Sequence, residues 1–348
     1  MKYKPLGNSG LMVSELCLGT MVFGEENTRG TDRKTAEQII HKYLDRGGNH
    51  IDTADVYAGG RSEEIVGAAI KDRRDQVILA TKVRHATGPG LNERGLSRYH
   101  IVRGVEASLR RLQTDVIDLL TAHCWDPITP LEETLRAFDD LVASGKVLYI
   151  GVSNYKAWQL MKALATSDAH GWARFIAAQY QYSLVQRNIE HEISDLCLSE
   201  GLGLTAWGPL GGGFLSGKYQ PGGKPEAGRL SMMPEETEES WGRRANERNW
   251  EILSAVDKIA KAHQVTHSQI ALAWLLKQPG IGSVIMGMRT LDQLDDNLAA
   301  GQLALSSEEL ERLDQVSQPD KPYPYRFIEL YGSRDPYPEV STSNATSI

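Results

Sequence analysis

The chain has 348 residues, of which 41% are hydrophobic and 24% are charged, a composition typical of globular rather than disordered or fibrous proteins. Its 45 Asp and Glu outnumber 38 Lys and Arg, and the net charge of −7 argues against a nucleic-acid groove, which needs clustered positive charge. The sequence has no run of about 18 apolar residues for a membrane span, no apolar signal region at its N-terminus, and only three scattered cysteines. We therefore expect a cytoplasmic protein without a nucleic-acid or membrane partner.

Short apolar runs alternate with longer amphipathic runs along the chain. The first residues predict a small hairpin with its turn at Asn8-Ser9-Gly10, followed by a first core strand. A helix is expected at 33–46, because apolar side chains recur there at helical spacing: Ala36, Ile39, Ile40, Tyr43 and Leu44. Further strands are expected at 50–54, 77–83, 116–123, 147–152, 175–181, 203–208 and 282–287. Further helices are expected at 62–73, 99–113, 130–144, after Asn154, after Asn188, and at 246–263, 268–277 and 291–300.

This alternation of strands and helices indicates the fold class. Strands of continuous apolar character, each followed by a helix, predict a parallel sheet that is buried on both faces. Roughly eight such units, with an N-terminal β-hairpin and a C-terminal extension, favour a (β/α)8 TIM barrel. A doubly wound Rossmann sheet is the alternative, but the segment 19–26 after the first strand lacks its G-x-G-x-x-G turn. We expect one domain, 1–348, with the barrel at about 12–302 and a tail at 303–348.

Polar side chains follow the ends of several predicted strands, where the catalytic groups of a TIM barrel lie. Early strands deliver Asp52, Tyr57, Lys82 and His123, and later ones deliver Ser153, Asn154, Gln179 and Trp207. Each residue alone also suits an ordinary role, such as a helix cap, a solvated charge or a packed core side chain. Their occurrence at successive strand ends predicts a site. The histidines lack a metal-ligand spacing such as HExxH, so we expect no metal.

Longer segments carry a likeness to a known family. These segments are GNSGLMVSELCLGTMVFG, HIDTADVYAGGRSEEIVGAAI, ILATKV, LEETLRAFDDLVASGKVLYIGVSN, AWGPLGGGFLSGKY and QLDDNLAA. With them the chain resembles the aldo-keto reductase superfamily, from Leu6 to Asn297. The GGGFLSGKY segment is most similar to the branch of bacterial sugar, aryl and quinone-like carbonyl reductases. The resemblance implies a catalytic tetrad of Asp52, Tyr57, Lys82 and His123.

Such a tetrad suits the reduction of a carbonyl group. Hydride addition leaves an alkoxide, and an ordinary tyrosine, with a pKa of about 10, is a reluctant proton donor. We expect the Lys82 ammonium to lower the pKa of Tyr57, while Asp52 holds the ammonium in place. His123 would donate a hydrogen bond to the carbonyl oxygen. Tyr57 is therefore the expected general acid for reduction and the general base for oxidation.

The resemblance also implies a cofactor, NADP, with NADPH preferred over NADH. Ser153, Asn154 and Gln179 match the residues that bind the nicotinamide carboxamide, and Trp207 matches an aromatic side chain stacked on the nicotinamide. Nicotinamide itself supplies the hydride in such enzymes.

The phosphate groups of this cofactor would face the later part of the chain. The glycine-rich segment 208–218 matches the loop over the pyrophosphate, to which Lys218 adds charge. Arg289 is the expected partner of a 2′-phosphate. The full set of implied cofactor-binding residues is Gly19, Thr20, Met21, Asp52, Ser153, Asn154, Gln179, Trp207, Gly208, Pro209, Leu210, Gly211, Leu215, Gly217, Lys218, Gly287, Arg289, Gln293 and Asn297.

Two other functions compete with an NADPH-dependent carbonyl reductase. The first is a nucleotide-binding, redox-sensing regulatory subunit with slow turnover, because some members of the family serve channels as β-subunits. The second is a metal-dependent TIM-barrel hydrolase, which the histidine spacing disfavours.

The substrate would be a small carbonyl compound: a sugar, an aryl aldehyde or another ring-bearing aldehyde or ketone. Loops at 84–97 and 211–244 and the tail beyond 318 are expected to shape its pocket, with Trp241, Tyr323, Tyr325 and Phe327 as candidate walls over the barrel mouth. Because 211–244 is rich in Gly, Pro, Glu and Ser, we expect it to bury little apolar surface and to be mobile without ligand. Its first part, Leu215 to Lys218, is expected to close over the pyrophosphate when the cofactor binds. A homo-oligomer is also compatible with the sequence, as is a chance origin of the glycosylation sequon at 344–346.

Overall fold

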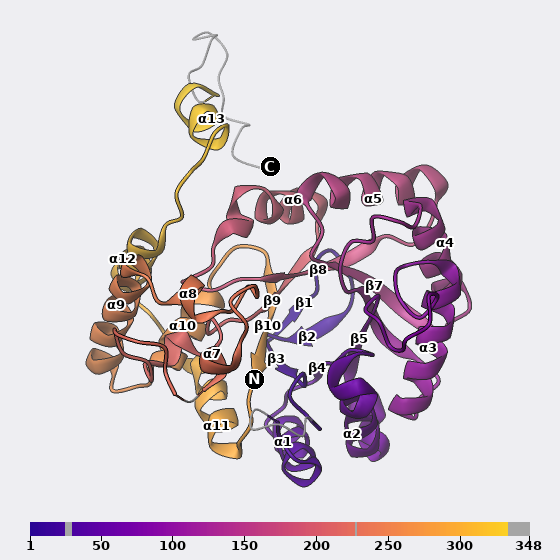
Figure 1. Ribbon diagram of the computed structural model, residues 1–348, viewed down its shortest axis with the longest axis horizontal. Helices are drawn as coiled ribbons and strands as arrows, with labels where there is room; N and C mark the ends of the chain where they lie inside the picture. Colours follow the sequence, from indigo (N-terminus) through magenta and orange to yellow (C-terminus); the bar gives the residue numbers. More distant parts are fainter. Residues whose placement is uncertain (25–29, 227, 333–348) are drawn as a thin grey trace.

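Parallel strands close into a barrel in the computed structural model of the chain, which describes residues 1–24, 30–226 and 228–332. The order around the barrel is β10-β3-β4-β5-β6-β7-β8-β9, so that its first and last strands pair with each other. Helices surround the barrel on the outside (Figure 1), and the expected (β/α)8 TIM barrel is therefore confirmed. The sequon at 344–346 lies outside the described residues. The barrel strands are β3 (Leu16–Gly19), β4 (His50–Asp52), β5 (Ile78–Val83), β6 (Ile117–Ala122), β7 (Val147–Ser153), β8 (Phe175–Gln181), β9 (Gly203–Trp207) and β10 (Ile281–Gly287).

The helices between the strands form where the apolar spacing predicted them. In the first of these helices, the side chain of Asp32 accepts a hydrogen bond from the backbone N–H of Thr35 at 3.0 Å and caps the helix. The five apolar residues expected on its inner face are all buried. The helices of this layer are α1 (Arg33–Asp45), α2 (Arg61–Ile70), α3 (Arg98–Leu112), α4 (Leu131–Ala143), α5 (Ala157–His170), α6 (Ile193–Glu200), α9 (Glu247–His263), α10 (His267–Leu275) and α11 (Leu291–Ala299).

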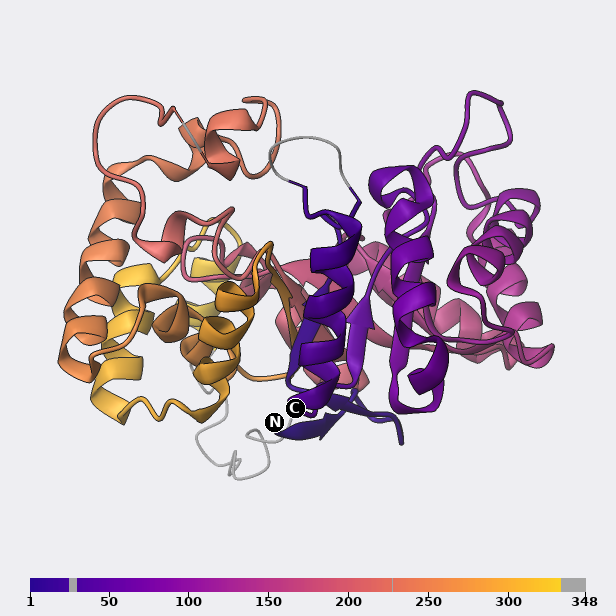
Figure 2. The same ribbon diagram turned by 90° about the horizontal axis from the view of Figure 1, so that it is seen from below.

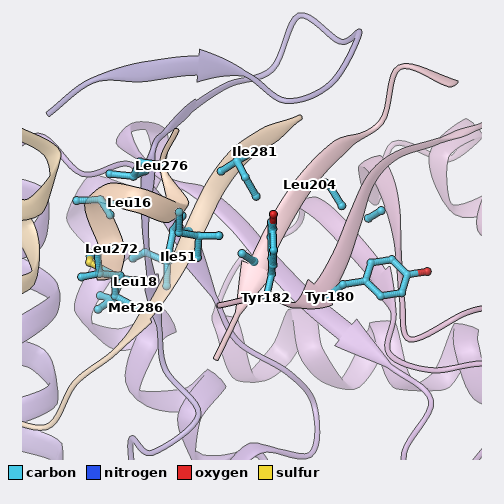
Figure 3. Packing of buried hydrophobic residues seen from close by; sticks show 14 of the residues in the cluster. Leu16, Leu18, Ile51, Tyr180, Tyr182, Leu204, Leu272, Leu276, Ile281 and Met286 are labelled. Atoms are coloured by element: carbon cyan, nitrogen blue, oxygen red, sulfur yellow. The ribbon is translucent and has the colours of Figure 1, made fainter. Parts of the chain in front are cut away.

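The main core lies between the barrel and these helices. Side chains at alternate strand positions point outward and pack against the apolar helix faces. Figure 3 shows Leu16 and Leu18 of β3 beside Leu272 and Leu276, from α10 and the residue after it. This layer fixes the barrel strands and therefore the direction of the side chains at their ends.

An N-terminal hairpin closes one end of the barrel. Its strands, β1 (Tyr3–Pro5) and β2 (Met12–Ser14), pair antiparallel as expected. The apolar residues of this hairpin pack against inward-facing residues of the barrel in a second core, which contains Leu6, Leu11, Val13, Ala80, Leu119 and Ala177. Figure 2 shows the hairpin at one end of the barrel and the long loops at the other. The carboxyl ends of the strands, with the predicted site residues, face these loops.

Further helices lie in the long loop after β9 and in the C-terminal part. The sequence analysis did not predict α7 (Arg229–Met232), α8 (Trp241–Arg244), α12 (Ser307–Ser317) or α13 (Tyr325–Gly332). Short 3-10 helices are η1 (Tyr57–Gly60), η2 (Lys71–Gln76), η3 (Asn188–His191), η4 (Phe214–Ser216) and η5 (Ala300–Gln302). Among the helices of the described ranges, none combines the length and the apolar character needed to cross a membrane.

Candidate active site

Side chains from three neighbouring strand ends meet at the carboxyl end of the barrel. The Nζ of Lys82, in β5, donates to Oδ2 of Asp52 at 2.5 Å and to the hydroxyl of Tyr57 at 3.1 Å. A third donation, at 2.8 Å, reaches the carbonyl oxygen of Thr53, so the ammonium group uses all three of its donors. The ring of His123, just after β6, meets the Tyr57 ring edge-on, with centroids 5.9 Å apart. The four residues predicted as catalytic thus form one cluster.

A chain of hydrogen bonds joins this cluster to the three residues expected at the nicotinamide. The second oxygen of Asp52, Oδ1, accepts from Nε2 of Gln179 at 2.8 Å. The Oγ of Ser153 donates to the carbonyl oxygen of Gln179 at 2.7 Å, and Nδ2 of Asn154 donates to that Oγ at 2.8 Å. Asn154 Nδ2 also donates to the carbonyl oxygen of His123 at 2.9 Å. The two sets of predicted residues are therefore parts of one network.

Opposing effects act on the two titratable groups at its centre. Burial disfavours the Lys82 ammonium, but Asp52 and Tyr57 outweigh it and raise the pKa of Lys82 above its usual value. Burial prevails at Tyr57 and raises its pKa, while Lys82 lowers it and Asp52 raises it. We expected Lys82 to lower the pKa of Tyr57, and its charge does act in that direction. The expectation is wrong for the net pKa, which burial raises above the usual value of a tyrosine. The phenol is consequently protonated at neutral pH, which is the form a proton donor needs.

His123 is a neutral imidazole in these surroundings. Burial, followed by the positive charge of Lys82, lowers the pKa of His123 to about 2. Its Nδ1 is buried and has no hydrogen-bond partner among the described residues. An orphaned N–H is rarer in protein interiors than an orphaned acceptor, so the proton belongs on Nε2. His123 can therefore donate a hydrogen bond from Nε2.

A second buried carboxyl group lies close to the cluster. Asp55 is 2% exposed, and neither of its carboxyl oxygens has a hydrogen-bond partner in the described part of the chain. Burial and the carboxylate of Glu63 raise the pKa of Asp55 from 3.8 to about 8, although Arg111 opposes them. Asp55 therefore carries a proton at neutral pH.

Glycines shape the segment that follows Trp207, the half-buried last residue of β9. Its glycines at 208, 211, 212, 213 and 217 have φ between 56° and 88°, a region that other residues rarely adopt. Space is also limiting, because a Cβ on Gly212 would lie 2.7 Å from Cδ2 of Leu230. Successive backbone N–H groups in such turns form concave sites that attract anions.

Three cations gather beside this glycine segment. Burial, Arg289 and Arg229 together lower the pKa of Lys218. Arg229, in α7, pairs with the buried carboxylate of Glu239 at 2.5 Å, while its Nε is buried without a partner among the described residues. This concentration of positive charge fits the phosphate groups of a dinucleotide such as NADP. The sequence analysis missed Arg229, because nothing in a polar stretch marks which arginine folds back toward the barrel.

The other predicted cofactor residues differ in how exposed they are and in which elements carry them. Thr20 and Leu215 are fully buried. Gln293, in α11, accepts a hydrogen bond at 2.8 Å from the backbone N–H of Arg289 and so orders the backbone there. The remaining members of the set lie along or just after β3, β9 and β10 or on α11: Gly19, Met21, Pro209, Leu210, Gly287 and Asn297.

The expectation that 211–244 buries little apolar surface is wrong for the described part of that stretch. Phe214 and Leu230 have no exposed surface, and Trp241 is 9% exposed. Trp241 packs against the rings of Tyr219 and Trp250, at centroid distances of 5.8 Å and 6.1 Å. Phe214, Leu230 and Trp241 are 11 or more positions apart along the stretch, so they form no periodic pattern that the sequence analysis could detect. The stretch has a small core of its own.

One side chain that the sequence analysis did not single out, His85, stands beside His123, and a second, Trp125, follows His123 two positions along the chain. The ring of His85 lies edge-on to the ring of His123, with centroids 4.5 Å apart. Trp125, which is half-buried, is 6.1 Å from the ring of Trp158, and Trp158 is 59% exposed. His85 and Trp125 each follow shortly after a strand end, and that position was the signal available in the sequence.

The aromatic residues expected to cover the barrel mouth lie elsewhere. Trp241 is enclosed in the loop core, and α13 stands off the barrel (Figure 1). Tyr323 and Phe327 are 84% and 56% exposed, and Tyr325 stacks on His191 at a centroid distance of 5.0 Å. The suggestion that the tail aromatics wall the pocket is therefore wrong.

Comparisons with known proteins bear on this cluster. The family model described as the aldo/keto reductase family matches residues 15–318. A probable voltage-gated potassium channel subunit beta of Arabidopsis thaliana is 38% identical over 94% of this chain and 100% of its own length. An uncharacterized oxidoreductase, YrpG, of Bacillus subtilis is 39% identical over 91% of this chain and 96% of its own. Versiconal hemiacetal acetate reductase of Aspergillus parasiticus is 34% identical over 93% of this chain and 99% of its own.

Proposed function

Since the chain belongs to the aldo/keto reductase family, we propose that it is an NADPH-dependent oxidoreductase that reduces an aldehyde or ketone to an alcohol. The observation that carries the proposal is the contact between the buried Lys82 ammonium and the Tyr57 hydroxyl, at 3.1 Å, with His123 beside them. A protonated phenol, a neighbouring cation and a neutral imidazole donor are the groups that carbonyl reduction needs.

In this proposal Tyr57 gives its proton to the oxygen of the reduced carbonyl. Burial keeps the phenol protonated until it reacts, and the Lys82 ammonium stabilises the phenolate that forms. Asp52 holds the ammonium, since its Oδ2 accepts a hydrogen bond from Nζ. The Nε2–H of His123 donates to the carbonyl oxygen, which positions it and stabilises the developing negative charge.

Nicotinamide would supply the hydride when NADPH is bound. The polar groups of Ser153, Asn154 and Gln179 would orient its carboxamide, and Trp207 would lie along its ring. Lys218, Arg229 and Arg289 would neutralise the phosphate groups, and the preference for NADPH would rest on Arg289.

We further propose a ring-bearing carbonyl compound as the substrate. Two aromatic side chains that follow strand ends of the site support this class: His85, whose ring lies edge-on to that of His123, and Trp125, which packs near the exposed Trp158. Flat rings of this kind offer stacking surface to an aryl or sugar carbonyl. One of the relatives named as reductases, from Aspergillus parasiticus, is named for the substrate versiconal hemiacetal acetate.

A regulatory subunit with slow turnover is the second candidate, because relatives from two plants are named as potassium channel β-subunits. Steady-state oxidation of NADPH with a panel of aryl aldehydes, sugars and quinones separates the two. A reductase completes many turnovers per protein molecule with at least one of these compounds. A single turnover, after which the oxidised cofactor stays bound, would favour the regulatory role instead.

A further inference from the structure

The turn that carries Tyr57 has an unusual backbone. Ala58, Gly59 and Gly60 follow it with φ of 49°, 65° and 95°, three successive residues in the left-handed region. Ala58 has a Cβ, which makes this conformation sterically unfavourable for it. A strained turn of this kind persists only where its surroundings hold it. The position of the Tyr57 hydroxyl therefore depends on the residues that hold this turn in place.

An ion pair between the buried Glu63 and the half-buried Arg111 lies beside this turn. The carboxylate of Glu63, in the first turn of α2, has no exposed surface. Its Oε2 accepts a hydrogen bond from Nε of Arg111, in α3, at 2.7 Å and forms an ion pair with Nη2 of the same arginine at 2.7 Å. Arg111 also contacts the turn, because a Cβ on Gly60 would lie 2.9 Å from its Cδ. The arginine side chain therefore supports the end of the turn that begins at Tyr57.

The other oxygen of Glu63 reaches the strand that carries Lys82. Its Oε1 accepts a hydrogen bond from Oγ1 of Thr81 at 2.6 Å, and Thr81 is the neighbour of Lys82 in β5. Thr81 faces outward from β5 and bonds to the ion pair, whereas its neighbour Lys82 faces inward and bonds to Asp52 and Tyr57. One carboxylate connects the support of the Tyr57 turn to the backbone beside Lys82.

We propose that Glu63 and Arg111 are positioning residues, which hold the Tyr57 turn against β5 and so fix the contact between Lys82 and Tyr57. This role rests on the proposed function, in which that contact carries the proton transfer. Neither residue touches the phenol itself. The charged groups that act on the Tyr57 hydroxyl are Lys82, Asp52 and Arg229.

The variants Glu63→Gln and Arg111→Met test this role. Small displacements of catalytic groups reduce rates steeply, so we expect kcat for carbonyl reduction to fall about 10- to 100-fold in both. The Kd for NADPH should stay within about twofold of the wild type, because the pair lies away from the glycine segment and its cations. Arg111→Lys, which keeps the charge and much of the reach, should recover part of kcat.

A matched control separates positioning from stability. Asp118 lies in β6, is 8% exposed and forms an ion pair with Arg74 at 2.8 Å. It also accepts a hydrogen bond from the backbone N–H of Leu79 at 2.8 Å. Asp118→Asn removes the charge of a comparable pair away from Tyr57. We expect it to lower the midpoint of thermal unfolding as Glu63→Gln does while kcat stays at the wild-type value.

A readout independent of turnover is the NMR signal of the Tyr57 phenol in protein labelled with ¹³Cζ-tyrosine, assigned with Tyr57→Phe. At pH 7 this resonance should shift in Glu63→Gln and Arg111→Met and stay unchanged in Asp118→Asn. The proposal is overturned if both variants keep the wild-type resonance and a kcat within twofold, or if Asp118→Asn loses kcat equally. If the wild type reduces no carbonyl at all, the proposed function fails, and the resonance alone decides the positioning role.

Discussion

The Nζ of Lys82 and the Oδ2 of Asp52 are 2.5 Å apart, and their side chains are 0% and 5% exposed. Two opposite charges so deeply buried stabilise the fold only as a pair, because each would be costly alone. Asp52 also accepts from Gln179, which leaves both of its oxygens bonded. The pair therefore connects the stability of the barrel to the chemistry proposed at Tyr57.

Replacing Lys82 by methionine should destabilise the protein by about 3–5 kcal/mol, because it leaves the Asp52 carboxylate buried without its cation. The double variant Lys82→Met, Asp52→Asn should regain most of this free energy of unfolding but none of the reductase activity. Denaturant unfolding and NADPH oxidation measure the two effects. A double variant no more stable than Lys82→Met would show that the carboxylate is not the source of the loss.

Tyr57→Phe removes the proposed proton donor and keeps the ring beside His123. We expect kcat to fall at least about 100-fold, which is typical for the loss of a general acid, while the affinity for NADPH is retained. Fluorescence titration with NADPH and steady-state turnover test both parts. Turnover within a few fold of the wild type would eliminate Tyr57 as the acid.

Arg289→Ala should weaken NADPH binding more than NADH binding, because only NADPH carries the 2′-phosphate. A lost charge-assisted hydrogen bond corresponds to roughly 1.5–3 kcal/mol, or about 10- to 150-fold in Kd. Calorimetric titration with the two cofactors measures the difference. Equal weakening of both would place Arg289 away from the 2′-phosphate.

Asp55→Asn should stabilise the protein increasingly as the pH rises from 5.5 to 9. The pKa of Asp55 is raised from 3.8 to about 8 by folding, so the folded state binds more protons than the unfolded state between these values. Stability of the wild type is therefore lost as pH rises through this window, at up to about 1.4 kcal/mol per pH unit, and asparagine removes that loss.

The midpoints of thermal unfolding of both proteins at pH 5.5, 7 and 9 test this prediction. The difference between variant and wild type should grow from the first to the last of these values. A constant difference would mean that Asp55 is ionised in the folded state throughout.

The sequence predicted the barrel well, because its signal is repeated along the chain. Apolar residues at 36, 39, 40, 43 and 44 mark a helix by spacing alone, and all are buried as expected. In contrast, α12 was missed although Ser306 and Glu309 form a capping box, a local signal that the sequence contains. Its single short amphipathic pattern lies beyond the last strand–helix unit.

The clustering of the four residues proposed as catalytic was predictable, because each stands at or just after a strand end with a family motif around it. The hydrogen bond from Gln179 to Asp52 was not, since it joins residues 127 positions apart in the chain. The net rise of the Tyr57 pKa was also beyond the sequence, because burial outweighs the attraction of Lys82. The net effect of burial and neighbouring charges on a pKa depends on three-dimensional packing, which a sequence motif does not reveal.

The central claim is that this protein reduces carbonyl groups with hydride from NADPH and a proton from Tyr57. The most direct test incubates the wild type and Tyr57→Phe with NADPH deuterated at the transferred position and an aryl aldehyde, then analyses the alcohol by mass spectrometry. We predict one deuterium per alcohol, on the former carbonyl carbon, over many turnovers of the wild type, and at least about 100-fold less alcohol from the variant. Alcohol without deuterium, no alcohol with any of the carbonyl panel, or equal yields from both proteins would contradict the account.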